Sequence, residues 1–268
     1  MAEGCPRSWA GRARLRRAGP CALALCFLAG PALAAPEEIE VYRDEVTPVG
    51  TWGLEVNQNY VVSGAKEDAG EGAFSPVGLY RLTPEIDYGL APNWEAGALV
   101  EATVRDRAFD AHGVKAHVRY IAPRPEASPW YWGFNFETGL TDKHLEERPF
   151  TAELRGIAGY EGERWIVAIN PTVETSIDSH AAEPVSFELQ AKIGYRVTKA
   201  LILGVESYNE FGPIEAFGPL GRQPQALFAT VDYAWRGMDL NVGVGRGLTN
   251  ASDGWTVKAV IGVPLGKP

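Results

Sequence analysis

The chain of 268 residues has only three cysteines, Cys5, Cys21 and Cys26, and all of them lie near its N-terminus. If that end is removed on secretion, the remaining chain has no thiol. A mature protein without cysteine cannot be a disulfide-stabilised scaffold, use a cysteine nucleophile or build a thiolate metal site.

Long apolar runs and an excess of basic residues are also missing. A transmembrane helix needs roughly 20 consecutive apolar residues, and no stretch after residue 35 supplies them. Only a closed β-barrel could then place the chain across a membrane. The formal net charge is −9. Because nucleic-acid binding needs a basic surface, we expect no nucleic-acid partner.

The N-terminus is typical of a secretory signal. Five arginines from Arg7 to Arg17 precede the apolar run 21–29, and the sequence Ala-Leu-Ala at 32–34, typical of a signal-peptidase cleavage site, follows. That apolar run is too short for a membrane anchor. We therefore predict a cleaved signal peptide over residues 1–35, a solvated acidic periplasmic segment over 36–50 and a β domain over 51–268. The periplasmic segment could form a short helix.

Apolar and polar residues alternate along most of that β domain. The clearest stretch is 130–140, where Trp130, Trp132, Phe136 and Leu140 fall on one face. A period of two predicts strands with one apolar and one polar face. We place twelve strands near 51–62, 79–90, 94–104, 113–121, 130–140, 150–160, 165–176, 185–195, 200–210, 225–235, 238–248 and 255–265.

Alternation alone fits two architectures. The apolar face packs on a second sheet in a soluble sandwich and meets lipid in an outer-membrane barrel. The connections separate the two, because bacterial barrels have short periplasmic turns and longer external loops. The predicted outer connections are 63–78, 105–112, 141–149, 176–184, 211–224 and 249–253, and the inner ones are 91–93, 122–129, 161–164, 196–199 and 236–237.

This sorting favours an all-β, antiparallel up-and-down transmembrane β-barrel of about twelve strands. The inner connection 122–129, with three prolines, is the long exception. Aromatic residues such as Trp94, Trp130, Trp165 and Trp235 near strand ends agree with the aromatic girdles of such barrels. A soluble periplasmic β-sandwich that binds a ligand stays the alternative fold.

The polar faces would line the lumen, where acids outnumber bases. On the fourth predicted strand, Lys115, His117 and Arg119 lie beside Glu95 and Glu101 of the third, so we expect ion pairs across the wall. Such pairs can be purely structural, or they can contact a solute. The predicted lumen residues are Glu55, Arg81, Glu85, Asp87, Glu95, Glu101, Lys115, His117, Arg119, Glu137, Glu153, Arg155, Glu174, Glu188, Lys192, Glu206, Asp232 and Lys258.

Strand number bears on the width of the pore. About eight strands leave an interior filled by side chains, and sixteen or more leave an open channel. Twelve strands predict a narrow pore, partly occluded by charge pairs and by the longer loops, with a mild preference for cations or neutral solutes. The loops 63–78 and 211–224 are the candidates for a plug.

Catalysis and metal binding have weak support. Ser176, Asp178, Ser179 and His180 are close in sequence, but such residues are common in turns. A pair of Asp142 or Asp110 with His112 or His144 is no better supported, and the spacing of Glu67, Asp68 and Glu71 matches no calcium loop. We expect no catalytic residue, no metal site and no cofactor, although a non-conducting barrel with a structural, adhesion or rim-enzyme role is an open alternative.

Three short stretches resemble known proteins. Residues 84–90 (PEIDYGL), 94–97 (WEAG) and 245–249 (GRGLT) are similar to strand-turn-strand stretches of proteobacterial outer-membrane proteins of the transporter type, in particular the MetA-pathway of phenol degradation family. The resemblance implies a barrel that moves small aromatic or hydrophobic compounds. A location in the outer membrane would make lipid, lipopolysaccharide and the outer-membrane assembly machinery its partners.

Overall fold

The structure is a computed structural model, and it describes residues 38–64, 74–105, 107–125, 128–145, 149–177 and 184–266. The predicted signal peptide, the carboxylates Glu67, Asp68 and Glu71, and residues 178–180 lie outside these ranges. Within them, no helix is long and apolar enough to cross a membrane.

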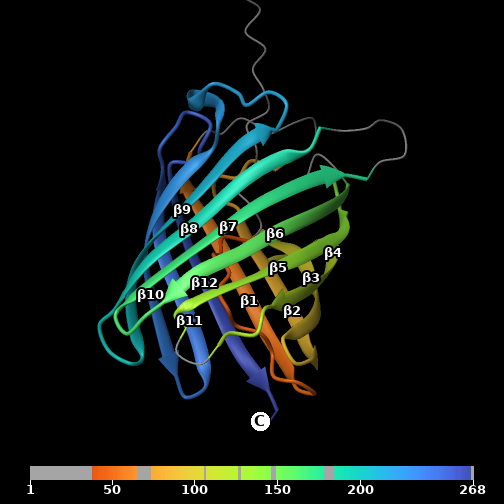
Figure 1. The fold of residues 1–268 in the computed structure, drawn as a ribbon. Helices are drawn as coiled ribbons and strands as arrows, with labels where there is room; N and C mark the ends of the chain where they lie inside the picture. Colours follow the sequence, from red (N-terminus) through yellow and green to blue (C-terminus); the bar gives the residue numbers. More distant parts are fainter. Residues whose placement is uncertain are drawn as a thin grey trace, which may run out of the picture. The chain divides into compact units, whose positions relative to one another are not determined.

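The described residues form one closed antiparallel barrel of twelve strands (Figure 1). Each strand pairs with the next along the chain, and β1 pairs with β12 to close the sheet. This confirms the predicted up-and-down barrel, and the sandwich alternative is wrong because there is a single sheet. The strands are β1 (Trp52–Ser63), β2 (Tyr80–Ala91), β3 (Trp94–Arg105), β4 (Ala108–Ile121), β5 (Trp130–Thr141), β6 (Phe150–Glu161), β7 (Trp165–Ser176), β8 (Ser186–Arg196), β9 (Leu201–Pro213), β10 (Gln225–Trp235), β11 (Met238–Gly247) and β12 (Trp255–Leu265).

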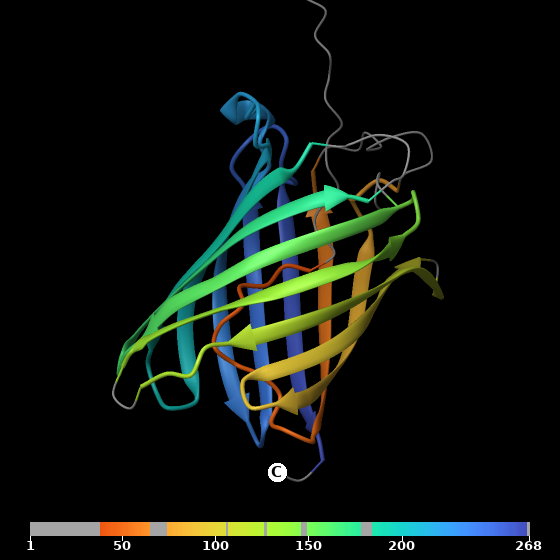
Figure 2. The same ribbon diagram turned by 45° about the vertical axis from the view of Figure 1, so that its right-hand side comes forward.

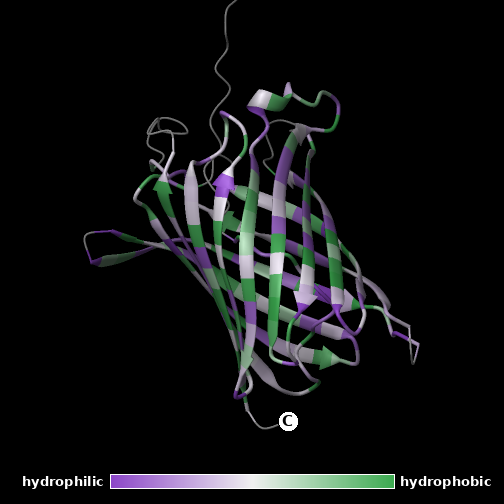
Figure 3. Ribbon diagram, turned by 90° about the vertical axis from the view of Figure 1, so that its left-hand side faces the viewer, coloured by the Kyte–Doolittle hydropathy of each residue, from purple (hydrophilic) through white to green (hydrophobic). Residues whose placement is uncertain are grey.

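Alternate residues of each strand face opposite sides of the barrel wall. On β5, Trp132 and Leu140 are 60% and 56% exposed, whereas Asn135 and Glu137 are buried. Figure 3 shows the same alternation of hydrophobic and hydrophilic residues along the strands. The apolar outside and polar inside reverse the arrangement of a soluble protein and match a barrel whose outer wall is solvated by lipid.

The two ends of the barrel differ in the length of their connections. The short-turn end carries residues 92–93, 122–129, 162–164, 197–200 and 236–237, and the long-loop end carries most of the longer connections, including 214–224 with the 3₁₀ turn η1 (Leu220–Arg222). Aromatic residues from adjacent strands contact each other near the short-turn end and form the predicted girdle. The pairs are Trp52–Tyr88, Trp94–Tyr120, Trp130–Tyr160 and Trp165–Tyr195, with ring centroids 4.6–5.1 Å apart.

One predicted loop is wrong. Residues 105–112 were expected to form a long connection, but β4 begins at Ala108, and residues 106–107 alone join it to β3. Arg107 adopts the left-handed conformation, with φ of 68°, in this tight turn. Residues 108–111 are exposed on both faces, so the hairpin extends beyond the wall. There a strand needs no alternation of apolar and polar residues, and the sequence pattern could not reveal it.

The described part of the predicted periplasmic segment, residues 38–50, contains no helix, and its residues 38–44 are buried or half-buried, whereas Glu45 and residues 48–50 are exposed. It is extended and passes through the inside of the barrel (Figures 1 and 2). Ile39, Val41 and Tyr42 are each 4–5% exposed. The prediction of a solvated segment is therefore wrong for these residues. A lumen lined by polar side chains can accept a segment that is rich in glutamate.

Candidate functional site

The candidate functional site is the lumen together with the segment that occupies it, residues 38–50, which we name the lumen segment. Its apolar side chains bury against two patches of the wall. Ile39 and Val41 pack with Ala168, Tyr208 and Phe228 of β7, β9 and β10. Burial of this much apolar side chain favours the docked arrangement, at roughly 25 cal/mol per Å² of apolar surface.

Tyr42 occupies the second apolar patch. The guanidinium groups of Arg119 and Arg155 lie 4.1 Å and 4.5 Å from the centroid of its ring. Cations that approach the face of an aromatic ring are attracted by it, more strongly where water is excluded. The patch itself is formed by Ile121, Tyr131 and Ile157.

Polar side chains of the wall bind the backbone of the lumen segment. The N–H of Tyr42 donates to Asn170 Oδ1 at 2.7 Å, and Asn170 Nδ2 donates to the carbonyl of Tyr42 at 3.1 Å. Lys258 Nζ donates to the carbonyl of Ile39 at 2.8 Å. These contacts satisfy backbone groups that would otherwise be buried without partners.

The segment is also fixed at the short-turn end. Asp44 forms an ion pair with Arg124 at 3.1 Å, and Arg124 belongs to the long inner connection 122–129, which thereby contacts the segment. The N–H of Thr47 donates to Glu95 Oε2 at 2.6 Å. Where the chain crosses β2, the Pro48 carbonyl oxygen lies 2.3 Å from the position that a Cβ of Gly89 would take, so the crossing requires glycine.

Every predicted lumen residue is buried or half-buried. The half-buried ones are Glu55, Arg119, Glu153, Glu174, Glu188 and Asp232, and the buried ones are Arg81, Glu85, Asp87, Glu95, Glu101, Lys115, His117, Glu137, Arg155, Lys192, Glu206 and Lys258.

The predicted ion pairs between the third and fourth strands are confirmed. Glu95 Oε1 lies 3.1 Å from Arg119 Nη1, and Glu101 Oε1 lies 2.8 Å from Lys115 Nζ. Neighbouring carboxylates and cations of this kind neutralise each other inside the barrel.

His117 reaches past β3 to the acids of β2. Its Nε2 lies 3.2 Å from Asp87 Oδ1, and its Nδ1 lies 3.6 Å from Glu85 Oε1. The residue between them in the sheet is Gly97. A Cβ there would lie 2.2 Å from Asp87 Oδ1 and 2.5 Å from His117 Cε1, so the absence of a side chain makes this contact possible.

A second charged network covers the wall from β8 to β12. Lys192 Nζ lies 2.9 Å from Glu206 Oε1 and 2.6 Å from Asp232 Oδ1. On the other side of Glu206, its Oε2 accepts from Lys258 Nζ and, at 2.7 Å, from the hydroxyl of Tyr208. Through Lys258 the network is joined to the backbone of the lumen segment.

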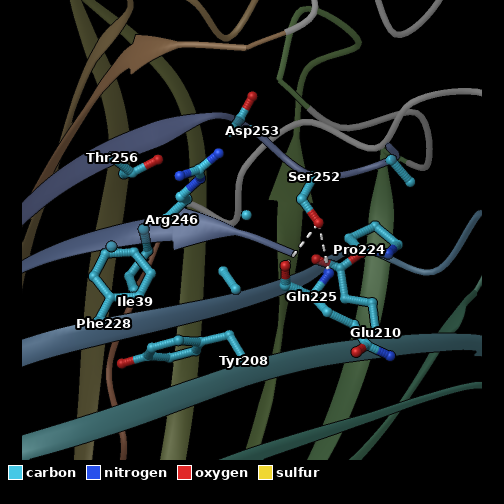
Figure 4. Close-up of a pocket in the computed structure, with 14 residues that line it drawn as sticks. Ile39, Tyr208, Glu210, Pro224, Gln225, Phe228, Arg246, Ser252, Asp253 and Thr256 are labelled. Atoms are coloured by element: carbon cyan, nitrogen blue, oxygen red, sulfur yellow. Dashed lines mark hydrogen bonds between the residues drawn. The ribbon is translucent and has the colours of Figure 1, made fainter. Parts of the chain in front are cut away.

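Two pockets lie on opposite sides of this network. The outer pocket, near the long-loop end, has a volume of about 60 Å³ and an apolar floor of Ile39, Tyr208 and Phe228 (Figure 4). Ser252 and Asp253 stand on its opposite side. Burial raises the pKa of Asp253, and Arg81 opposes this.

The inner pocket, near the short-turn end, is larger and more polar. Its volume is about 290 Å³, and seven carboxylate and four cationic side chains line it. The two pockets share no lining residue. Glu206 lines the inner pocket, and its hydrogen-bond partner Tyr208 lines the outer one, so the Lys258–Glu206–Tyr208 contact stands between them.

The long-loop end carries a separate cluster. His112 Nδ1 lies 2.9 Å from Asp142 Oδ2, and His144 Nδ1 lies 3.1 Å from Asp142 Oδ1. Burial would raise the pKa of Asp142, but hydrogen bonds from His112 and from the backbone N–H of His144 outweigh it and lower the pKa. An Asp/His pair among these residues had only weak support from the sequence, but the structure brings Asp142 together with both histidines. Asp110 is not among the members of this cluster.

Sequence reasoning missed Asn170, Asn57 and the lumen segment. Asn57 donates to Glu40 Oε2 at 3.1 Å. A signal for the segment was present, since Ile39 and Val41 alternate with Glu38 and Glu40 as in a strand with one apolar face. The many acidic residues of the segment favoured the interpretation that it is solvated.

The fold is similar to that of known outer-membrane barrels. No protein-family model matches the chain, and no curated protein matches it significantly. Among solved structures, an outer membrane channel from Pseudomonas putida F1 is similar, with a TM-score of 0.56 and 14% identity over 85% of this chain and 100% of that one. The KdgM porin has a TM-score of 0.53 and 11% identity over 80% and 99% of the two chains, and the NanC porin has 0.53 and 10% over 80% and 100%. At these identities the likeness establishes a shared fold, the twelve-stranded barrel of outer-membrane proteins.

Proposed function

We propose that this protein is a narrow channel of the Gram-negative outer membrane through which small solutes enter, and that the lumen segment constricts its pore. The observation that carries the proposal is the pair of separate pockets, one at each end, with the Lys258–Glu206–Tyr208 contact and Ile39 between them. A solute would pass along the β9–β12 wall.

The apolar outer wall supports the membrane location. A band of exposed apolar residues on the strands, bounded by an aromatic girdle, is what lipid requires of a barrel. The long-loop end would face the cell exterior and lipopolysaccharide, and the short-turn end the periplasm. Insertion would depend on the outer-membrane assembly machinery.

The charge of the inner pocket supports a preference for cations or neutral solutes. Carboxylates outnumber cations among its lining residues, and a vestibule of one sign of charge concentrates ions of the other sign. The predicted plugs, loops 63–78 and 211–224, are replaced in this proposal by the lumen segment.

The solute class rests on resemblance. The similarity of residues 84–90, 94–97 and 245–249 to the MetA-pathway of phenol degradation family suggests small aromatic or hydrophobic compounds. The apolar floor of the outer pocket would suit such a solute.

Recordings in planar lipid bilayers test this function. The purified protein should form small, stable conductances, and a gradient of KCl should give a reversal potential of the sign for K⁺ preference. Absence of any conductance from barrels that shift in mobility on heating would refute the channel, and a clear anion preference would refute the role assigned to the inner carboxylates.

A further inference from the structure

We propose that His112, Asp142 and His144 form a binding site for a divalent transition-metal ion, such as Zn²⁺, at the long-loop end of the barrel. His112 lies on β4, and the other two lie in the connection between β5 and β6. This site is separate from the lumen segment and its pockets, and it does not depend on the channel function.

The spacing of the ligand atoms fits such an ion. Bonds of about 2.0–2.1 Å in a tetrahedral site place ligand atoms roughly 3.3 Å apart. The two nitrogen–oxygen distances here are 2.9 Å and 3.1 Å, and one ligand atom from each residue lies within 4.8 Å of the others. A modest expansion around an ion therefore suffices.

Buried contacts orient the ligands in advance. Thr103 Oγ1, which is fully buried, lies 2.9 Å from His112 Nε2. With an ion bound, Nε2–H would donate to Thr103, and the Nδ1 lone pair of His112 would face the ion in place of the hydrogen bond from Nδ1 to Asp142. A hydrogen bond on the second ring nitrogen is the usual way in which proteins fix a metal-binding histidine.

The backbone holds the other two residues in place. The N–H of Asp142 donates to the carbonyl of His112 at 2.7 Å, and the N–H of Phe74 donates to the carbonyl of His144 at 2.9 Å. The ring of Phe74 stacks on His144, with centroids 4.9 Å apart. Both histidines therefore sit in defined positions although they belong to different elements.

The donor set indicates the class of ion. Two imidazoles and one carboxylate suit Zn²⁺, Ni²⁺ or Cu²⁺, whereas Ca²⁺ and Mg²⁺ prefer oxygen ligands alone. The side chains of Asp142 and His144 are 40% and 42% exposed, so water can complete the coordination. Bound metal would tie the β3–β4 hairpin to the β5–β6 connection.

The test is calorimetric titration of the untagged mature protein in detergent with ZnCl₂, after folding is checked by the mobility shift on heating. Wild type should bind one Zn²⁺ per chain. Because loss of an orienting partner costs about 10–100-fold in metal affinity, Thr103→Val should weaken binding by that factor. His144→Ala removes a ligand and should weaken binding more than Thr103→Val does. The rim variant Asp110→Asn serves as the control and should bind as wild type does, because Asp110 is not among the residues of the cluster.

Two results would overturn the site. One is a wild-type protein that takes up no Zn²⁺. The other is equal Zn²⁺ affinity in wild type and His144→Ala, because the ion would then be held elsewhere. Titration with Co²⁺ gives a second readout, since the visible bands of a nitrogen- and oxygen-ligated ion should appear in wild type and be lost in the His144 variant.

Discussion

The side chain of Asn170 hydrogen-bonds both backbone groups of Tyr42, its N–H at 2.7 Å and its carbonyl at 3.1 Å. An asparagine of the wall thereby takes the place of a neighbouring strand for a segment inside the barrel. This contact and the apolar burial of Ile39, Val41 and Tyr42 hold the lumen segment in the pore.

Asn170→Ala should loosen the segment. Buried donors and acceptors left without partners cost roughly 1–3 kcal/mol, so the variant should show larger and noisier conductances in bilayers. Asn135→Ala is the matched control, because Asn135 is equally buried but neither of its side-chain polar atoms has a hydrogen-bond partner. Equal effects of the two substitutions would mean that Asn170 acts only by filling space.

Lys258→Met should strengthen the preference for cations. The substitution removes the cation between the two pockets and leaves Glu206 with Lys192 as its remaining cationic partner. Breaking a buried pair costs about 3–5 kcal/mol, so folding is checked by the mobility shift before the reversal potential is measured. Lys199→Met, which alters an exposed cation of the inner pocket, should change the potential less. A shift toward anions in the Lys258 variant would contradict the proposed path.

Gly97→Ala should destabilise the barrel. The added Cβ would lie 2.2 Å from Asp87 Oδ1, and relieving such overpacking typically costs about 1–3 kcal/mol. Gly262→Ala is the control, because the nearest atom to its Cβ would be at 3.8 Å. Urea unfolding in detergent measures both, and an unaffected Gly97 variant would show that the His117–Asp87 contact can shift without cost.

Ile169→Lys should weaken folding into lipid. Ile169 is 41% exposed, near the middle of β7, and a lysine facing the bilayer midplane costs roughly 2–4 kcal/mol. Ile214→Lys should cost little, because Ile214 is exposed and lies in the connection after β9, outside the strands of the wall. Unfolding measurements in lipid vesicles compare the two. Similar stability of both variants would argue that the wall around β7 does not face lipid.

The strands could be predicted from sequence because apolar and polar residues alternate with a period of two wherever one face of a strand meets lipid and the other meets the polar lumen. This pattern failed at residues 105–112, where the β3–β4 hairpin leaves the wall and both faces are exposed. The ion pairs of Arg119 and Lys115 were predictable because they join neighbouring strands. The contacts of Tyr42 with Asn170 were not, since 128 residues separate them and no local pattern links them.

For the cluster of His112, Asp142 and His144, the sequence offered only possible Asp/His pairs and no reason to prefer one of them. His112 and Asp142 are 30 residues apart, and they meet because the β4–β5 register pairs their neighbours Gly113 and Thr141. Composition could indicate acids and histidines at this end, but not which of Asp110 and Asp142 reaches the imidazoles.

The most direct test of the central claim compares the unitary conductance of wild type with that of a variant lacking residues 38–46, both confirmed as folded barrels by their mobility shift. Because the lumen segment fills part of the lumen and places Ile39 between the two pockets beside the Lys258–Glu206–Tyr208 contact, its removal should widen the passage and give a clearly larger conductance. An unchanged conductance in the shortened barrel would contradict the claim that this segment constricts the pore.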